Sequence, residues 1–143
     1  MRNFLSLFIF LATTIGYSQQ LSCEDFKTGE FFIEVSSPLK MEWEIVRNGN
    51  EQVEIYDKIS QEFKDQGFPS GPLYLRIDWI DDCNYRMFFD ESKGIPTEVD
   101  KKMTEAGGLL VEMVKIEGDC FYYASSINVD GENYITEGKI CRK

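Results

Sequence analysis

The sequence predicts an all-β protein: an antiparallel meander of about eight strands that curls into an open barrel, with one short helix. Most of the chain consists of short runs in which apolar and polar residues alternate, and turn residues such as Asn, Asp and Gly separate these runs. No repeat, low-complexity tract or linker interrupts the pattern. The predicted strands cover residues 30–36, 41–47, 51–57, 73–80, 84–90, 109–117, 120–129 and 132–141.

The first eighteen residues have the three parts of a secretory signal peptide. Arg2 gives a positive start, an apolar run follows, and small residues around Ser18 form a cleavage site. We therefore expect cleavage near Ser18-Gln19, which leaves residues 19–143 as a single β domain with the length usual for one domain. The apolar run is too short to span a membrane, and no second one follows, so we expect no integral membrane segment in the mature chain.

The turn at residues 47–52, RNGNEQ, sets the register of the second and third strands. A two-residue turn at Asn48-Gly49 would place Trp43 opposite a glutamate. A three-residue loop over 48–50 instead pairs Ile45 with Val53 and keeps one face apolar. We therefore expect the three-residue loop.

Two connections separate the remaining predicted strands. Residues 58–72 contain a predicted helical turn in KISQEFKDQ, and residues 96–106, PTEVDKKMTEA, predict a short helix that Gly107-Gly108 ends. Between them, the strands 73–80 and 84–90 keep their apolar faces together only if their connection has an odd length. We expect the five-residue connection 80–84, which places Cys83 in the turn.

The last three strands follow from two turns. Asp130-Gly131 is a strong two-residue hairpin signal, and Gly118-Asp119 makes the preceding turn. The resulting register puts one set of apolar residues on a single core-facing side: Leu110, Val114, Ile116, Phe121, Tyr123, Ile127, Tyr134 and Ile140. The opposite, outward side of the first of these strands then carries Leu109, Val111 and Met113.

Four cysteines in a chain with an export signal indicate disulfides. The hairpin register places Cys120 directly opposite Cys141, in a non-hydrogen-bonded pair where side chains approach closely. By elimination, Cys23 pairs with Cys83. No C-x-x-C motif is present, and two aspartates precede Cys83, so a redox or metal-binding role for the cysteines is not expected.

Composition excludes several classes of function. The formal net charge is −10, which repels nucleic acid and anionic membrane surfaces. The chain contains no histidine, which removes the usual general base and the commonest zinc ligand. No nucleotide-binding or nucleophile motif is present. We therefore expect no catalytic residue, no cofactor and no metal.

Carboxylates are the remaining candidates for catalysis. Several of them cluster around the central hairpin: Asp78, Asp81, Asp82, Asp90 and Glu91. A hydrolase would need two of them to converge in a cleft. In an acidic chain, a solvated turn is the simpler interpretation.

Aromatic residues are abundant and fall on faces predicted to point inward. A filled core and a partly open barrel with a bound ligand are both consistent with this pattern. For the second alternative, the predicted ligand-binding residues are Trp43, Trp79, Tyr85 and Tyr123.

Several short motifs resemble a group of small exported bacterial proteins that have no established function. The matching residues are C-x-D-F-K-x-G-x-F from Cys23, W-x-x-D-C-x-Y from Trp79, Arg47 with Gln52-x-Glu54, and the later Gly118-Asp119 and Gly138-Lys139-Ile140. Members have sometimes been labelled DNA topoisomerase IV, but this chain is acidic and far too small for strand passage. The resemblance implies a lipocalin-like sheet in which the first two motifs are joined by a disulfide.

The leading functional hypothesis is a non-enzymatic binding module, periplasmic or secreted, with a small apolar ligand in the barrel. The alternative is a structural or assembly protein that contacts another extracytoplasmic protein through an exposed sheet face over Leu109, Val111 and Met113. A carboxylate-based hydrolase is the third and weakest hypothesis.

Overall fold

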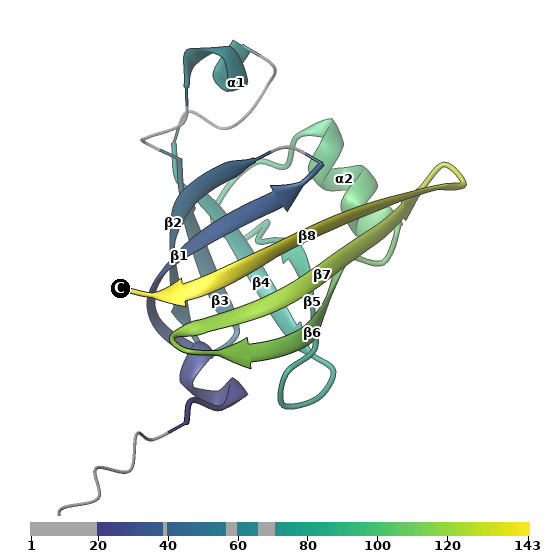
Figure 1. Ribbon diagram of the computed structural model, residues 1–143. Coiled ribbons are helices and arrows are strands. Elements are labelled where there is room, and N and C mark those ends of the chain that lie inside the picture. The colour runs from purple at the N-terminus through teal and green to yellow at the C-terminus, as the bar shows by residue number, and fades with distance from the viewer. Residues whose placement is uncertain (1–19, 39, 57–59, 66–70) are drawn as a thin grey trace, which may run out of the picture.

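A computed structural model describes residues 20–38, 40–56, 60–65 and 71–143. The predicted signal peptide and its cleavage site lie outside these residues. The described chain forms a closed barrel of eight antiparallel strands in sequence order (Figure 1). The strands are β1 (Thr28–Ser37), β2 (Met41–Asn48), β3 (Glu51–Ile55), β4 (Leu73–Trp79), β5 (Tyr85–Phe89), β6 (Leu109–Glu117), β7 (Cys120–Val129) and β8 (Glu132–Arg142).

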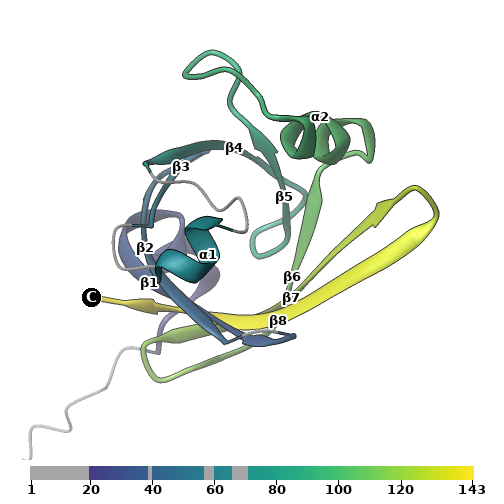
Figure 2. The same cartoon turned by 90° about the horizontal axis from the view of Figure 1, so that it is seen from above.

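The predicted all-β meander is therefore confirmed, but the barrel is closed rather than open. Closure comes from β1, which pairs with β8 over most of its length. The weakest seam lies between β5 and β6, which pair only over Tyr85–Met87 and Leu109–Val111. The β7–β8 hairpin continues past the barrel wall and projects outward (Figure 2).

Three helical segments accompany the strands. The 3-10 helix η1 (Cys23–Phe26) lies at one end of the barrel, and α1 (Gln61–Asp65) lies beyond the other (Figure 1). The helix α2 (Glu98–Glu105) lies outside the barrel beside β5 (Figure 2). It begins where predicted, after Thr97. The Thr97 hydroxyl accepts a hydrogen bond from the Asp100 amide, and the Asp100 carboxylate accepts one from the Thr97 amide. Gly107 and Gly108, both with positive φ, end it.

The predicted loop between β2 and β3 is wrong by one residue. The turn is Gly49-Asn50, so Val46 pairs with Val53 and Arg47 pairs with Gln52. The prediction assumed that the inward face of these strands is apolar. The structure instead turns Arg47, Gln52 and Glu54 into the interior, and the reason lies in the site described below.

The predicted core face of β6 is also wrong over its first half. A β-bulge between Met113 and Lys115 shifts the register. Odd-numbered side chains therefore face the core before the bulge, and even-numbered ones face it afterwards. Val111 is buried at 1% exposure, and Leu109 and Met113 pack against the core. Val114, predicted to face the core, is 64% exposed. The patch proposed for protein contact therefore faces inward.

The C-terminal register and the central hairpin agree with the sequence. Val129 pairs with Glu132 and Cys120 with Cys141, as the Asp130-Gly131 turn predicts. Phe121, Tyr123 and Ile140 are buried, whereas Tyr134, which pairs with Ile127 close to the Asp130-Gly131 turn, is 54% exposed. In the central hairpin, Trp79 pairs with Tyr85, which leaves the connection 80–84 as expected.

Candidate functional site

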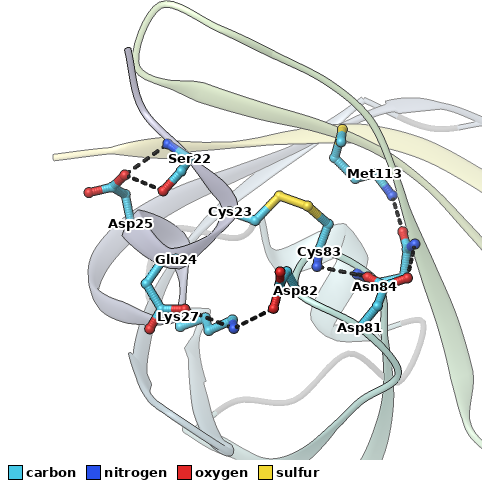
Figure 3. Close-up of a disulfide and its surroundings, with 10 residues drawn as sticks. All are labelled: Ser22, Cys23, Glu24, Asp25, Lys27, Asp81, Asp82, Cys83, Asn84 and Met113. Carbon is cyan, nitrogen blue, oxygen red and sulfur yellow. Dashed lines mark hydrogen bonds and ion pairs between the residues drawn. A yellow bond between two sulfur atoms is a disulfide. The ribbon is translucent and has the colours of Figure 1, made fainter. Parts of the chain in front are cut away.

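Both predicted disulfides are present in the structure. Cys120 and Cys141 join adjacent strands at a Cα separation of 4.1 Å. Cys23 and Cys83 connect η1 to the turn before β5, at a Cα separation of 5.1 Å (Figure 3). This second bridge holds η1 against one end of the barrel, where Phe26 packs on Phe31 and Phe121.

The two aspartates beside Cys83 have different roles. Asp81 accepts hydrogen bonds from the backbone amides of Cys83 and Asn84 and from the Asn84 side chain (Figure 3). These bonds lower the pKa of the Asp81 carboxyl. Asp82 is fully exposed and lies 4.0 Å from the Lys27 ammonium. Asp81 therefore shapes the turn that presents Cys83 to Cys23.

Of the other carboxylates of the central hairpin, Asp78 is paired with Arg76, and Asp90 and Glu91 do not converge with this pair. Asp81 and Asp82 precede β5, whereas Asp90 and Glu91 follow it, so the two pairs lie at opposite ends of that strand. Asp90 bonds to Ser92. Within the described ranges, no three Asp, Glu, Cys or His side chains are placed to share a metal ion.

The four predicted ligand-binding residues are distributed along the barrel. Trp79 and Tyr85 pack together near η1, with ring centroids 4.8 Å apart. Tyr123 is buried in the wall opposite Gly138. Trp43 lies toward the α1 end and stacks on Tyr56 at 5.3 Å. Tyr85 and Tyr123 nevertheless belong to one hydrophobic core inside the barrel, and Trp43 and Trp79 pack against it.

A buried arginine lies at the centre of the interior. Arg47 is 2% exposed, and each of its three guanidinium nitrogens donates a hydrogen bond. Nε donates to Gln52 Oε1 at 2.6 Å, one terminal nitrogen donates to the Phe26 carbonyl at 3.0 Å, and the other donates to the Tyr85 hydroxyl. Since the charge cannot reach water, these bonds are what makes its burial tolerable.

The hydrogen bonds continue from Arg47 along the barrel. Gln52 Nε2 donates to Glu54 Oε1 at 2.7 Å, and the Tyr56 hydroxyl donates to Glu54 Oε2. We call Arg47, Gln52, Glu54, Tyr56 and Tyr85 the axial network. It runs inside the barrel from the η1 end toward the α1 end.

Burial sets the acid–base properties of the axial network. Desolvation raises the pKa of Glu54, although the hydrogen bonds from Tyr56 and Gln52 and the charge of Arg47 act in the opposite direction. Burial also raises the pKa of Tyr85 and of Tyr56. A hydrogen bond from the Trp43 side chain also helps to hold the pKa of Glu54 down.

A hollow of about 280 Å³ lies on the outside of the barrel, over β1, β8, β7 and β6. We call it the outer hollow. Cross-strand neighbours form a row along it: Glu34 pairs with Lys139, Lys139 with Tyr122, and Tyr122 with Lys115. The remaining residues that line it are Ser36, Val114, Tyr123, Glu137 and Gly138.

Two β-bulges flank the outer hollow. One lies in β6 at Val114 and the other in β1 at Ser36, on either side of the β7–β8 hairpin. A bulge bends and twists its strand and redirects a side chain. Here the two bulged residues both line the hollow, and Ser36 Oγ donates to the Glu137 carbonyl at 3.1 Å. The concavity is therefore a consequence of the backbone, not only of side-chain positions.

Charged groups of the outer hollow are paired but accessible. Lys139 Nζ lies 3.3 Å from Glu34 Oε2, and both side chains are about one-third exposed (32% and 28%). Lys115 Nζ lies 4.8 Å from the ring centroid of Tyr122 and 2.8 Å from Glu117 Oε2. The site thus offers an aromatic ring, ammonium donors and carboxylate acceptors side by side.

Comparisons with models of protein families, with curated proteins and with solved structures found no match. Among the helices that the structure describes, none is long and apolar enough to cross a membrane.

Sequence reasoning did not find the axial network or the outer hollow. Arg47, Gln52 and Glu54 were singled out only as part of a resemblance, although the two-residue spacing of Gln52 and Glu54 on β3 was a signal for one polar face. The outer hollow depends on two bulges, and neither leaves a clear mark in an alternating strand pattern.

Proposed function

We propose that this chain is a non-enzymatic binding module that acts outside the cytoplasm and takes its ligand in the outer hollow. Export is supported by the signal-like N-terminus and by two disulfides, which are typical of oxidising compartments. The observation that carries the choice of site is the contrast between the axial network, whose polar groups are buried and hydrogen-bonded to one another inside the barrel, and a hollow that is open on the outer wall.

Rigidity supports the outer hollow as a recognition site. It lies on four neighbouring strands, and Cys120–Cys141 ties two of them together near one end. A site on paired strands loses little conformational entropy when it binds a ligand. The paired charges of Lys139 and Glu34 are also already oriented.

Amide NMR on the oxidised chain 19–143 tests this proposal. The probes are a set of small polar molecules added one at a time: neutral sugars, amino acids and short carboxylates. We expect at least one probe to shift the amides of Tyr122, Gly138 and Lys139. Shifts confined to Trp43 and its neighbours, or no shifts with the whole set, would contradict the outer hollow as the binding site.

An apolar ligand inside the barrel is a second candidate, and one observation favours it. The Trp43 ring stacks on Tyr56 at 5.3 Å and is only partly buried, so it offers aromatic surface at that end of the barrel. An apolar ligand would pack against this surface. Native mass spectrometry of freshly purified protein tests the idea: a bound apolar molecule that is lost from Trp43→Ala supports it, and a ligand-free mass argues against it.

A further inference from the structure

The outer hollow combines charges of both signs in equal number. Among its lining residues, Lys115 and Lys139 are balanced by Glu34 and Glu137, in a protein whose formal net charge is −10. A site with locally balanced charge gains little from an ionic ligand, and Lys139, Glu34 and Lys115 already have partners. It suits a neutral ligand that can both donate and accept hydrogen bonds.

Apolar surface is present in the same place. The Tyr122 ring lies in the middle of the cross-strand row, and Val114 is 64% exposed because its bulge turns it away from the core. The face of an aromatic ring is a large apolar surface. The C–H groups on one side of a saturated ring can pack against it. The ligand that fits should therefore have an apolar face and a polar edge.

Size restricts the ligand further. A volume of about 280 Å³ lies just below the range of about 300–1,000 Å³ that is usual for pockets holding drug-sized molecules. The outer hollow can therefore hold a small ring compound or a short piece of a chain of rings.

We propose that the outer hollow binds a neutral saccharide, one or two rings of which contact the protein, with a sugar face on Tyr122 and hydroxyl groups bonded to Lys139, Glu34 and Glu137. This inference rests on the proposed function and names the ligand class for the same site. The Lys115 ammonium, which now lies over Tyr122 and is half-exposed, moves aside when the sugar stacks on the ring.

Amide NMR and calorimetric titrations test the ligand class. The probes are neutral trisaccharides of α-linked glucose, β-linked glucose, mannose and N-acetylglucosamine, with tetra-alanine as a peptide probe. We expect at least one saccharide to bind and to shift the amides of Tyr122 and Lys139. If only tetra-alanine moves these amides, the saccharide inference fails while the binding site stands. If no saccharide moves them, the saccharide inference fails. If the amino acids and short carboxylates of the first set also leave them unmoved, the proposed binding site fails as well.

Two tyrosine variants provide a matched comparison. Tyr122→Ala should weaken saccharide binding at least tenfold, whereas Tyr122→Phe should retain most of it because the ring remains. Tyr74→Ala is the control, since Tyr74 lies on the outer side of β4 with Lys93 Nζ 6.0 Å from its ring centroid. Equal affinity in the wild type and in Tyr122→Ala, or equal losses in Tyr122→Ala and Tyr74→Ala, would overturn the inference. Native amide spectra of each variant exclude misfolding as the cause.

Discussion

The barrel interior and the outer hollow are made from the same kinds of side chain in different surroundings. Each combines cations, carboxylates and tyrosines: Arg47, Glu54 and Tyr85 inside, and Lys139, Glu34 and Tyr122 outside. Inside, Arg47 is 2% exposed and Glu54 is 4% exposed. Both side chains form hydrogen bonds to Gln52, which lies between them. Outside, the paired groups remain within reach of water.

This difference separates structure from recognition. A buried charge that loses its partner is strongly unfavourable, so the axial network enforces one register of β2, β3 and β5. An exposed ion pair contributes little to stability and can exchange partners with a ligand at small cost. The following predictions test that division, from the largest expected effect to the smallest.

Removal of the buried cation should have the largest effect. Arg47→Met leaves the Tyr85 hydroxyl, the Phe26 carbonyl and Gln52 without their donor, and we expect the free energy of unfolding to fall by about 3–5 kcal/mol. Urea unfolding measures it. The matched change outside, Lys139→Met, should cost less than about 1 kcal/mol. If the free energy of unfolding fell by similar amounts in the two variants, the buried and exposed charges would not differ in their contribution to stability.

Gly138 lies at the boundary between the two regions, and its replacement should have an intermediate effect. A Cβ at this position would lie 2.4 Å from the Glu34 carbonyl oxygen and 2.7 Å from the Tyr123 hydroxyl. We therefore expect Gly138→Ala to destabilise the protein by about 1–3 kcal/mol, as overpacking does. Gly71→Ala is the control, because among the described residues, apart from its chain neighbours, no heavy atom lies within 4 Å of its Cβ position. An unchanged Tm in Gly138→Ala would show that the wall is looser than the structure indicates.

The titration of Glu54 should change the free energy of unfolding least, when the change is measured per pH unit. Its pKa is raised in the folded state by burial, so the folded protein binds this proton more tightly than the unfolded chain. This contribution to stability is fully present below the unfolded pKa and is lost as pH rises through the folded value. For one group the slope cannot exceed about 1.4 kcal/mol per pH unit.

A Glu54→Gln variant isolates this contribution, since it keeps the shape but does not titrate. Urea unfolding of both proteins at a series of pH values above the normal carboxyl range should show wild type losing stability relative to Glu54→Gln. A stability difference that grows in favour of wild type as pH rises would mean that the Arg47 charge dominates over desolvation at Glu54.

Local signals in the sequence were sufficient for much of the fold. Asp130-Gly131 determined the β7–β8 register through to Cys120 and Cys141, because a two-residue turn aligns every later pair in a hairpin without bulges. The odd-length connection at 80–84 likewise followed from the two apolar faces that it joins. Each of these predictions used only residues close together along the chain or paired through one turn.

Only the tertiary structure decided the rest. Barrel closure requires β1 to meet β8, the two ends of the described sheet, and no local pattern encodes that contact. The turn at Gly49-Asn50 places Gln52 and Glu54 in the interior with Arg47. A rule that puts only apolar residues inside cannot predict an interior whose polar groups are hydrogen-bonded to one another. The bulges at Val114 and Ser36 each reverse the parity of a strand, and together they form the outer hollow. The sequence by itself therefore determined the strands, most turns and both disulfides, whereas closure, the axial network and the candidate site depend on contacts between distant segments.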